Sequence, residues 1–223
     1  MITASKQALV SWAWRRYVSF KVRAAFRAVW VSGALPRGPD PIIVYANHTN
    51  FWDGFVAHEV MRHAERDVYA MMEEVNLQKY RFLRRLGAFS VRRGSASSAR
   101  ESLRHAGELL RRPAASVLIF PQGSIQPFEA PLKFERGVEL LSRMTGARCV
   151  PMAIRYAVFE HEFPDVMVGI GDAHPCESSA SMAERLTLLR DALSTRQSPE
   201  GLEPMMQGRA SVAQRWDAAR GLA

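Results

Sequence analysis

The sequence predicts a single α/β domain in which a mixed, largely parallel central sheet is flanked by helices. Short apolar runs typical of strands alternate with helical stretches of about ten to fifteen residues, an order that favours a sheet covered on both faces. The chain has 223 residues, of which 48% are hydrophobic and 23% charged, so it is long enough for one well-buried core.

The expected strands are apolar runs bounded by turn residues. They are residues 42–46, 68–72, 88–91, 116–120, 149–154 and 166–170. The expected helices show apolar residues at helical spacing. They are residues 55–64, 74–86, 97–111, 134–145 and 182–193.

The N-terminal element, residues 1–33, is expected to contain a long amphipathic helix. Residues 5–31 place aromatic and aliphatic side chains among basic ones, with no proline or glycine. Two interpretations stay open. The helix either lies on a membrane surface, with its cations near anionic lipid, or packs on its own domain.

A turn-rich connector, residues 33–41, leads from this helix into the main domain. We expect the α/β domain to occupy residues 34–195. In residues 196–223, Pro199, Gly201 and Pro204 precede a short expected helix through Trp216. They are predicted to form a peripheral C-terminal extension.

The chain is strongly basic, with 30 Lys and Arg against 22 Asp and Glu, a net charge of +8 and a pI near 10.1. Such a surface attracts anions, so nucleic acid, anionic lipid headgroups and phosphorylated substrates are the candidate partners. Because the basic residues are dispersed and no known nucleic-acid module is present, a nucleic-acid-binding protein is the less favoured alternative.

The N-terminal sequence does not resemble a secretory signal, and no segment is long and apolar enough to span a bilayer. We therefore expect a cytoplasmic protein, peripheral on the cytoplasmic face of the membrane. The two cysteines, Cys149 and Cys176, form no metal-binding or disulfide pattern. The acidic and histidine residues of 160–174 match no ligand motif either, and no metal site is predicted.

The segment after the first expected strand carries the clearest catalytic signal. His48 and Asp53 are separated by four residues, directly after the apolar run 42–46. A histidine takes a proton near neutral pH, and an aspartate that accepts its other ring N–H fixes the tautomer and stabilises the imidazolium. The alternative is that Asp53 caps a helix beginning at Gly54 and that His48 is an ordinary loop residue.

Further polar segments follow the other expected strands, and sites in such sheets gather at strand ends. Arg92 and Arg93 end one strand, and Gln122, Gly123 and Ser124 form a turn after another. Residues 150–154 place a proline at the start of a third. In the turn, the backbone N–H groups of residues 122–124, or those at the start of the helix after Asp53, are candidate donors to an oxyanion.

These segments, in this order, resemble the lysophosphatidic acid acyltransferase family of glycerolipid acyltransferases over most of residues 42–154. The family is marked by Asn-His-x4-Asp, a glycine-containing segment ending in arginine, Phe-Pro-Glu-Gly-Thr-Arg, and Val-Pro-hydrophobic-Ala. The matching residues are Asn47, His48, Asp53, Gly87, Arg93, Phe120, Pro121, Gly123, Val150, Pro151 and Ala153. The resemblance implies the fold of glycerol-3-phosphate acyltransferase.

The segment that corresponds to Phe-Pro-Glu-Gly-Thr-Arg departs from the family pattern. Gln122 stands where the family has glutamate, Ser124 replaces threonine and Ile125 replaces arginine. In the family this arginine is associated with the phosphate of the acceptor, and isoleucine cannot supply its bidentate bonds. Either Arg92 and Arg93, or the cations Lys133 and Arg136, are then left to hold a phosphate.

The resemblance implies an O-acyltransferase, similar to 1-acyl-sn-glycerol-3-phosphate acyltransferase, that acts in phospholipid metabolism. His48 would be the base and Asp53 its orienting partner. Arg92, Arg93, Gln122, Gly123 and Ser124 would bind the acceptor. The donor would be acyl-CoA or acyl carrier protein, the acceptor a lysophospholipid or another lipid alcohol, and no cofactor is expected. A thioesterase and a non-catalytic lipid-binding member are the alternatives.

Overall fold

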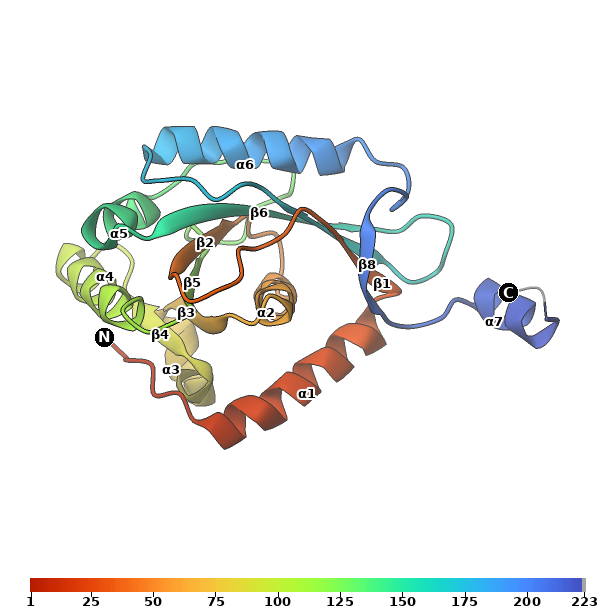
Figure 1. Ribbon diagram of the computed structural model, residues 1–223, viewed down its shortest axis with the longest axis horizontal. Helices are drawn as coiled ribbons and strands as arrows, with labels where there is room; N and C mark the ends of the chain where they lie inside the picture. The colour runs from red at the N-terminus through yellow and green to blue at the C-terminus, as the bar shows by residue number, and fades with distance from the viewer. Residues whose placement is uncertain (222–223) are drawn as a thin grey trace.

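Strand β2 (Ile42–Ala46) lies near the middle of an eight-stranded sheet in the computed structural model, which describes residues 1–221 (Figure 1). The sheet has the order β4-β3-β5-β2-β6-β7-β1-β8. The other strands are β1 (Ala28–Ser32), β3 (Asp67–Glu73), β4 (Ala88–Val91), β5 (Ala115–Ile119), β6 (Arg148–Ala157), β7 (Asp165–Ile170) and β8 (Glu203–Gln207).

The block from β4 to β6 is parallel throughout, while β7 runs antiparallel to β6 and β8 antiparallel to β1. Strand β1 is parallel to β7. The predicted fold class, one α/β domain with a mixed, largely parallel sheet, is therefore confirmed. Its parallel block brings the carboxyl ends of β2, β4, β5 and β6 to one edge of the sheet, where sites form in such folds.

Helices cover both faces of the sheet (Figure 1). Those with residues in the larger core clusters are α1 (Ala8–Ala25) and α2 (Asp53–His63) on one face, and α4 (Ala96–Leu109), α5 (Gly137–Thr145) and α6 (Ser179–Ser194) on the other. Ser95 and Ser178 cap the N-termini of α4 and α6 by accepting backbone N–H groups. Gly146, at a φ of 71°, ends α5.

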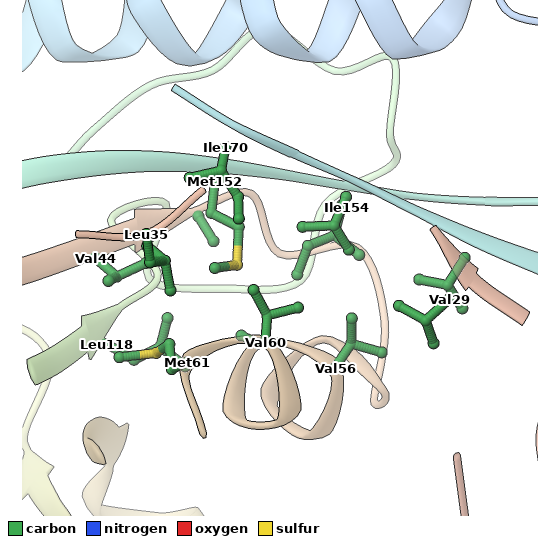
Figure 2. Close-up of a cluster of buried hydrophobic side chains, with 14 of the residues drawn as sticks. Val29, Leu35, Val44, Val56, Val60, Met61, Leu118, Met152, Ile154 and Ile170 are labelled. Atoms are coloured by element: carbon green, nitrogen blue, oxygen red, sulfur yellow. The ribbon is translucent and has the colours of Figure 1, made fainter. Parts of the chain in front are cut away.

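The side chains of β2 divide between the two apolar cores. Val44 and Ala46 point into the cluster shared with α1 and α2, and Ile43 and Tyr45 into the cluster on the other face. All of β2 is buried, which explains its continuous apolar sequence. Figure 2 shows the first cluster, where Val56, Val60 and Met61 of α2 face the underside of the sheet.

The prediction of a helix over residues 5–31 is wrong at its C-terminal end. Helix α1 ends at Ala25, and Ala28–Ser32 form strand β1 instead. Val29 and Val31 are β-branched, and β1 has strands on both sides that supply its backbone partners. Within residues 1–221, no helix combines the length and the apolarity that crossing a membrane requires.

Other expected elements also differ. The predicted helix 74–86 is two elements, α3 (Glu74–Lys79) and the 3₁₀-helix η1 (Arg81–Leu86), and the helix expected at 134–145 begins at Gly137. The C-terminal residues are not merely peripheral, because β8 completes the sheet beside β1. The short helix expected there is α7 (Val212–Ala219).

A buried polar contact joins α1 to α2. Ser19 of α1 donates a hydrogen bond of 2.6 Å to the carboxylate of Glu59, which is fully buried in α2. Arg62 donates to the same oxygen at 3.0 Å, and Nδ1 of His58 lies 3.6 Å from the other oxygen. Burial pushes the pKa of Glu59 upward, but His58, Arg62 and Ser19 together outweigh it and lower this pKa to about 2.

Substitution Glu59→Gln should lower the free energy of unfolding by about 2 kcal/mol at pH 7, because Ser19 and Arg62 lose a charged acceptor. The pKa of Glu59 lies below its ordinary value, so this stabilisation is fully present above about pH 4.5 and is lost as the pH falls toward 2. Urea unfolding at pH 7 and near pH 3.5 measures it.

The control is Glu101→Gln on the exposed face of α4, which should leave stability unchanged at both pH values. A loss for Glu59→Gln that is equally large at both pH values would contradict the role assigned to the ionised carboxylate.

Candidate active site

His48 and Asp53 lie together at the carboxyl end of β2. Nδ1 of His48 is 2.9 Å from Oδ2 of Asp53. Asp53 is fully buried at the start of α2, whereas the side chain of His48 keeps 23% of its surface exposed. An ionised aspartate accepts only, so this contact fixes the neutral imidazole with its proton on Nδ1 and the lone pair on Nε2.

The backbone before α2 wraps around the Asp53 carboxylate. Oδ2 accepts the N–H groups of Thr49 at 2.5 Å and Asn50 at 2.9 Å, in addition to His48. These donors precede Asp53, whereas the side chain of an N-cap binds N–H groups that follow it. Asp53 is the first residue of α2 and the preceding residue, Trp52, holds the cap position, so the interpretation of Asp53 as a cap is wrong.

Tyr156 of β6 also binds Asp53. Its hydroxyl donates to Oδ1 of the carboxylate at 2.8 Å. Burial, followed by the charge of Asp53, raises the pKa of Tyr156 far above its usual value. The hydroxyl therefore stays protonated and remains a donor at physiological pH.

Asn47 fixes the loop to β6. Its side-chain amide donates to the carbonyl of Ile154 at 2.9 Å, and its side-chain oxygen accepts the N–H of Ile154 at 2.7 Å. The Asn47 side chain thereby continues the pairing of β2 with β6, which in the backbone ends at Ala46 and Met152. This contact joins the Asn-His-x4-Asp segment to residues 150–154, which carry the Val-Pro-hydrophobic-Ala pattern.

The turn after β5 binds both backbone polar groups of His48. Oε1 of Gln122 accepts the N–H of His48 at 2.8 Å, and the N–H of Gln126 donates to the carbonyl of His48 at 2.8 Å. The ring of Phe120 stacks on the imidazole with a centroid distance of 4.2 Å. Across residues 1–221 no protein atom hydrogen-bonds Nε2 of His48, so this nitrogen is available to a substrate.

Arg93 reaches the same turn from the end of β4. Gly123 has a φ of 70°, and a Cβ added to it would lie 3.7 Å from Nε of Arg93, so the guanidinium lies against this glycine. The side chain is exposed, and no carboxylate of the described residues lies within 4.0 Å of it. The structure thus brings Arg93, Gly123, Gln122 and His48 together.

Arg92 is engaged elsewhere. Its guanidinium donates to Oε1 of Glu74 at 2.7 Å, and this bond lowers the pKa of Glu74. Among the substitute cations, Arg136 is paired with Glu139 at 3.2 Å. Arg93 is therefore better placed than Arg92 or Arg136 to meet an anionic group.

The turn also offers backbone donors. The N–H of Gly123 donates to the carbonyl of Phe120 at 3.0 Å and is used within the turn. In the part of the chain that the structure describes, the N–H groups of Gln122 and Ser124 have no protein acceptor. The Ser124 hydroxyl accepts from the side chain of Gln126 at 2.8 Å.

No group of three or more His, Cys, Asp or Glu residues within 1–221 is arranged to hold a metal. Asp165 and His174, which belong to the acidic and histidine segment of the sequence, have other partners. Arg27 and Trp30 bind Asp165, and Tyr45 binds His174.

Sequence reasoning missed two contributors to the site. The sequence identifies Phe120 only as part of a motif, and no sequence pattern points to Tyr156. Tyr156 follows Ile154 by two residues on β6, so it points to the same face of the sheet, but no local pattern shows that Asp53 lies there.

A family model described as Acyltransferase matches residues 29–155, more than half of the chain. No curated protein sequence matches this chain. Among solved structures, that of the 1-acyl-sn-glycerophosphate acyltransferase PlsC from Thermotoga maritima resembles this chain with a TM-score of 0.64 at 18% sequence identity. The match covers 84% of this chain and 83% of that one, so the two share a fold.

Proposed function

Because the chain belongs to the acyltransferase family, we propose that it transfers a fatty acyl group from an acyl thioester to a hydroxyl of a lipid or glycerol-like acceptor. The observation that carries this proposal is the His48–Asp53 pair at the carboxyl edge of the parallel block, where Nε2 of His48 has no hydrogen-bond partner among residues 1–221. The fold shared with a lysophosphatidic acid acyltransferase supports it.

In the proposed step, Nε2 of His48 removes the proton of the acceptor hydroxyl as its oxygen attacks the thioester carbonyl. Asp53 stabilises the imidazolium that forms, through the 2.9 Å contact with Nδ1. When the tetrahedral intermediate collapses, the carbon–sulfur bond breaks and His48 returns the proton to the thiolate. The products are an ester and a free thiol, and no acyl-enzyme forms.

The oxyanion of that intermediate needs hydrogen-bond donors. The N–H groups of Gln122 and Ser124 are proposed for this role, since neither has an acceptor among the residues that the structure describes and both belong to the turn that holds His48. The step needs no metal or other cofactor, because His48 itself handles the proton. The donor is either acyl-CoA or acyl carrier protein.

We propose that Arg93 binds an anionic group of the acceptor. Its guanidinium lies against Gly123, and Gln122 of the same turn contacts the backbone of His48. A guanidinium suits phosphate because it donates two parallel charge-assisted bonds. This role would compensate for Ile125, which stands where the family has its phosphate-associated arginine.

A lipid acceptor requires access to a membrane, and α1 provides a suitable surface. Leu9 and Phe20 are 78% and 67% exposed, and Trp12 and Tyr17 are about half exposed. Exposed basic residues accompany them on the helix: Arg15, Arg16, Lys21 and Arg23. We propose that α1 lies at the interface of anionic membranes, with its aromatic side chains among the headgroups.

The first test is release of free thiol from palmitoyl-CoA and from palmitoyl-acyl carrier protein. Lysophosphatidic acid, glycerol 3-phosphate and an unphosphorylated lipid alcohol serve as separate acceptors. His48→Ala should lower turnover by at least about 100-fold, because general-base catalysis is lost, and the variant should still unfold cooperatively on heating.

The matched control is His63→Ala, which replaces an exposed histidine at the end of α2 and should retain full activity. Thiol release that needs no acceptor would indicate a thioesterase. Normal acyl transfer by His48→Ala would refute the proposed base.

Substitution Arg93→Gln should raise KM for a phosphorylated acceptor by roughly tenfold, because one charge-assisted contact is lost. KM for an unphosphorylated alcohol should stay unchanged. Initial rates over a range of acceptor concentrations measure both values. Arg104→Gln, on the exposed face of α4, is the control. Equal KM values for Arg93→Gln and the unaltered protein would remove Arg93 from the acceptor site.

Replacing Leu9 and Phe20 of α1 with serine should weaken binding to vesicles containing phosphatidylglycerol by roughly tenfold for each residue, since exposed apolar area is lost. These substitutions change only the exposed surface of α1, whereas deletion of residues 1–33 would also remove β1 from the sheet. Leu188→Ser on α6, across the sheet, is the control for an exposed leucine. If the Leu9 and Phe20 variants cosediment with vesicles as well as the unaltered protein does, the proposed membrane role of α1 is wrong.

A further inference from the structure

Among the described residues, Tyr156 is the one hydrogen-bond donor to the Asp53 carboxylate that comes from outside the segment 47–53. His48, Thr49 and Asn50 all reach the carboxylate from the loop itself. Tyr156 reaches it from β6, more than a hundred residues later in the chain, with an O–O distance of 2.8 Å.

The two carboxylate oxygens of Asp53 are used differently. Oδ2 receives His48, Thr49 N–H and Asn50 N–H. Oδ1 receives the hydroxyl of Tyr156 at 2.8 Å and that of Thr49 only at 3.4 Å. The Tyr156 hydroxyl is thus the close donor that holds Oδ1, and thereby the orientation of the whole carboxylate.

The position of Tyr156 is itself fixed. Its ring packs against Phe26, with centroids 5.5 Å apart. Two residues earlier on β6, the backbone of Ile154 is bound at both its N–H and its carbonyl by Asn47. The catalytic loop is therefore attached to β6 at its first residue through Asn47 and at its last through Asp53.

We infer that Tyr156 is a positioning residue for the His48–Asp53 pair, whose hydroxyl holds Oδ1 of Asp53 so that Oδ2 faces Nδ1 of His48. This inference rests on the proposed function, in which His48 is the base. Without the hydroxyl, a fully buried carboxylate oxygen loses its close donor, and the carboxylate turns to recover one. The His48 contact then opens more often.

Tyr156→Phe is the direct test, because phenylalanine keeps the ring that packs on Phe26 and removes only the hydroxyl. Palmitoyl-CoA is the donor, with the acceptors named above. We expect kcat to fall roughly tenfold, as for the loss of one hydrogen bond to a charged group, while KM stays within about twofold.

The matched control is Tyr45→Phe. The hydroxyl of the buried Tyr45 bonds Nε2 of His174 at 3.0 Å, but Tyr45 lies in the core on the other face of the sheet. Both variants lose one hydrogen-bonded hydroxyl and are expected to lose similar stability in thermal unfolding. Only Tyr156→Phe should lower kcat.

A second readout requires no acceptor. The Nδ1 proton of His48 is observed by nitrogen-15-edited proton NMR and assigned by its absence in His48→Ala. In Tyr156→Phe its exchange with water should be several-fold faster, because the bond to Asp53 opens more often. In Tyr45→Phe the exchange should be unchanged.

Unaltered kcat and unaltered Nδ1 exchange in Tyr156→Phe would overturn the inference. So would a loss of kcat that Tyr45→Phe shares in proportion to its loss of stability. His48→Ala separates this result from a failure of the proposed function. If that variant is inactive while Tyr156→Phe is normal, only the role of Tyr156 is wrong. If it is fully active, the role of His48 as base is wrong.

A double-mutant cycle with Asp53→Asn gives an independent answer. If Tyr156 acts through Asp53, adding Tyr156→Phe to the Asp53→Asn variant should reduce kcat by less than about twofold. A full, additive reduction in the double variant would show that Tyr156 does not act through this carboxylate.

Discussion

The Asp53 carboxylate is fully shielded from water, and an ionised group in that position is tolerated only where hydrogen-bond donors surround it. Its donors come from the loop after β2 and from β6, so the carboxylate can be satisfied only when both segments are in place. This requirement links folding to the site, because the same contacts that satisfy Asp53 also orient His48. The imidazole of His48 is therefore held in place by the packed edge of the sheet.

The parallel block of the sheet brings distant residues to this edge. The ends of β2, β4 and β5 carry His48, Arg93 and Gln122, which the sequence separates by up to 74 positions. In a site assembled in this way, different strands supply different groups. The end of β2 supplies the imidazole of His48, the turn after β5 holds the His48 backbone and offers N–H donors, and the end of β4 adds the cation of Arg93.

Local sequence does not predict the secondary structure of segments whose pairing partners lie far away in the chain. Residues 28–32 continue the apolar pattern of α1, yet they form β1, because β7 and β8 supply the backbone partners of a strand. Residues 203–207 carry a proline and have few strand-forming residues, and only pairing with β1 makes them a strand. Pairing across the sheet outweighs local propensity in both cases.

The sequence by itself determined the α/β class, the central strands and the pair His48 and Asp53, because apolar periodicity and motif spacing are local properties. The tertiary structure decided which arginine faces the turn, since only packing shows that Glu74 pairs with Arg92 while Arg93 lies against Gly123. It also brought Tyr156 to Asp53. That contact depends on the register between β2 and β6, which is fixed by the pairing of whole strands and cannot be read from either segment alone.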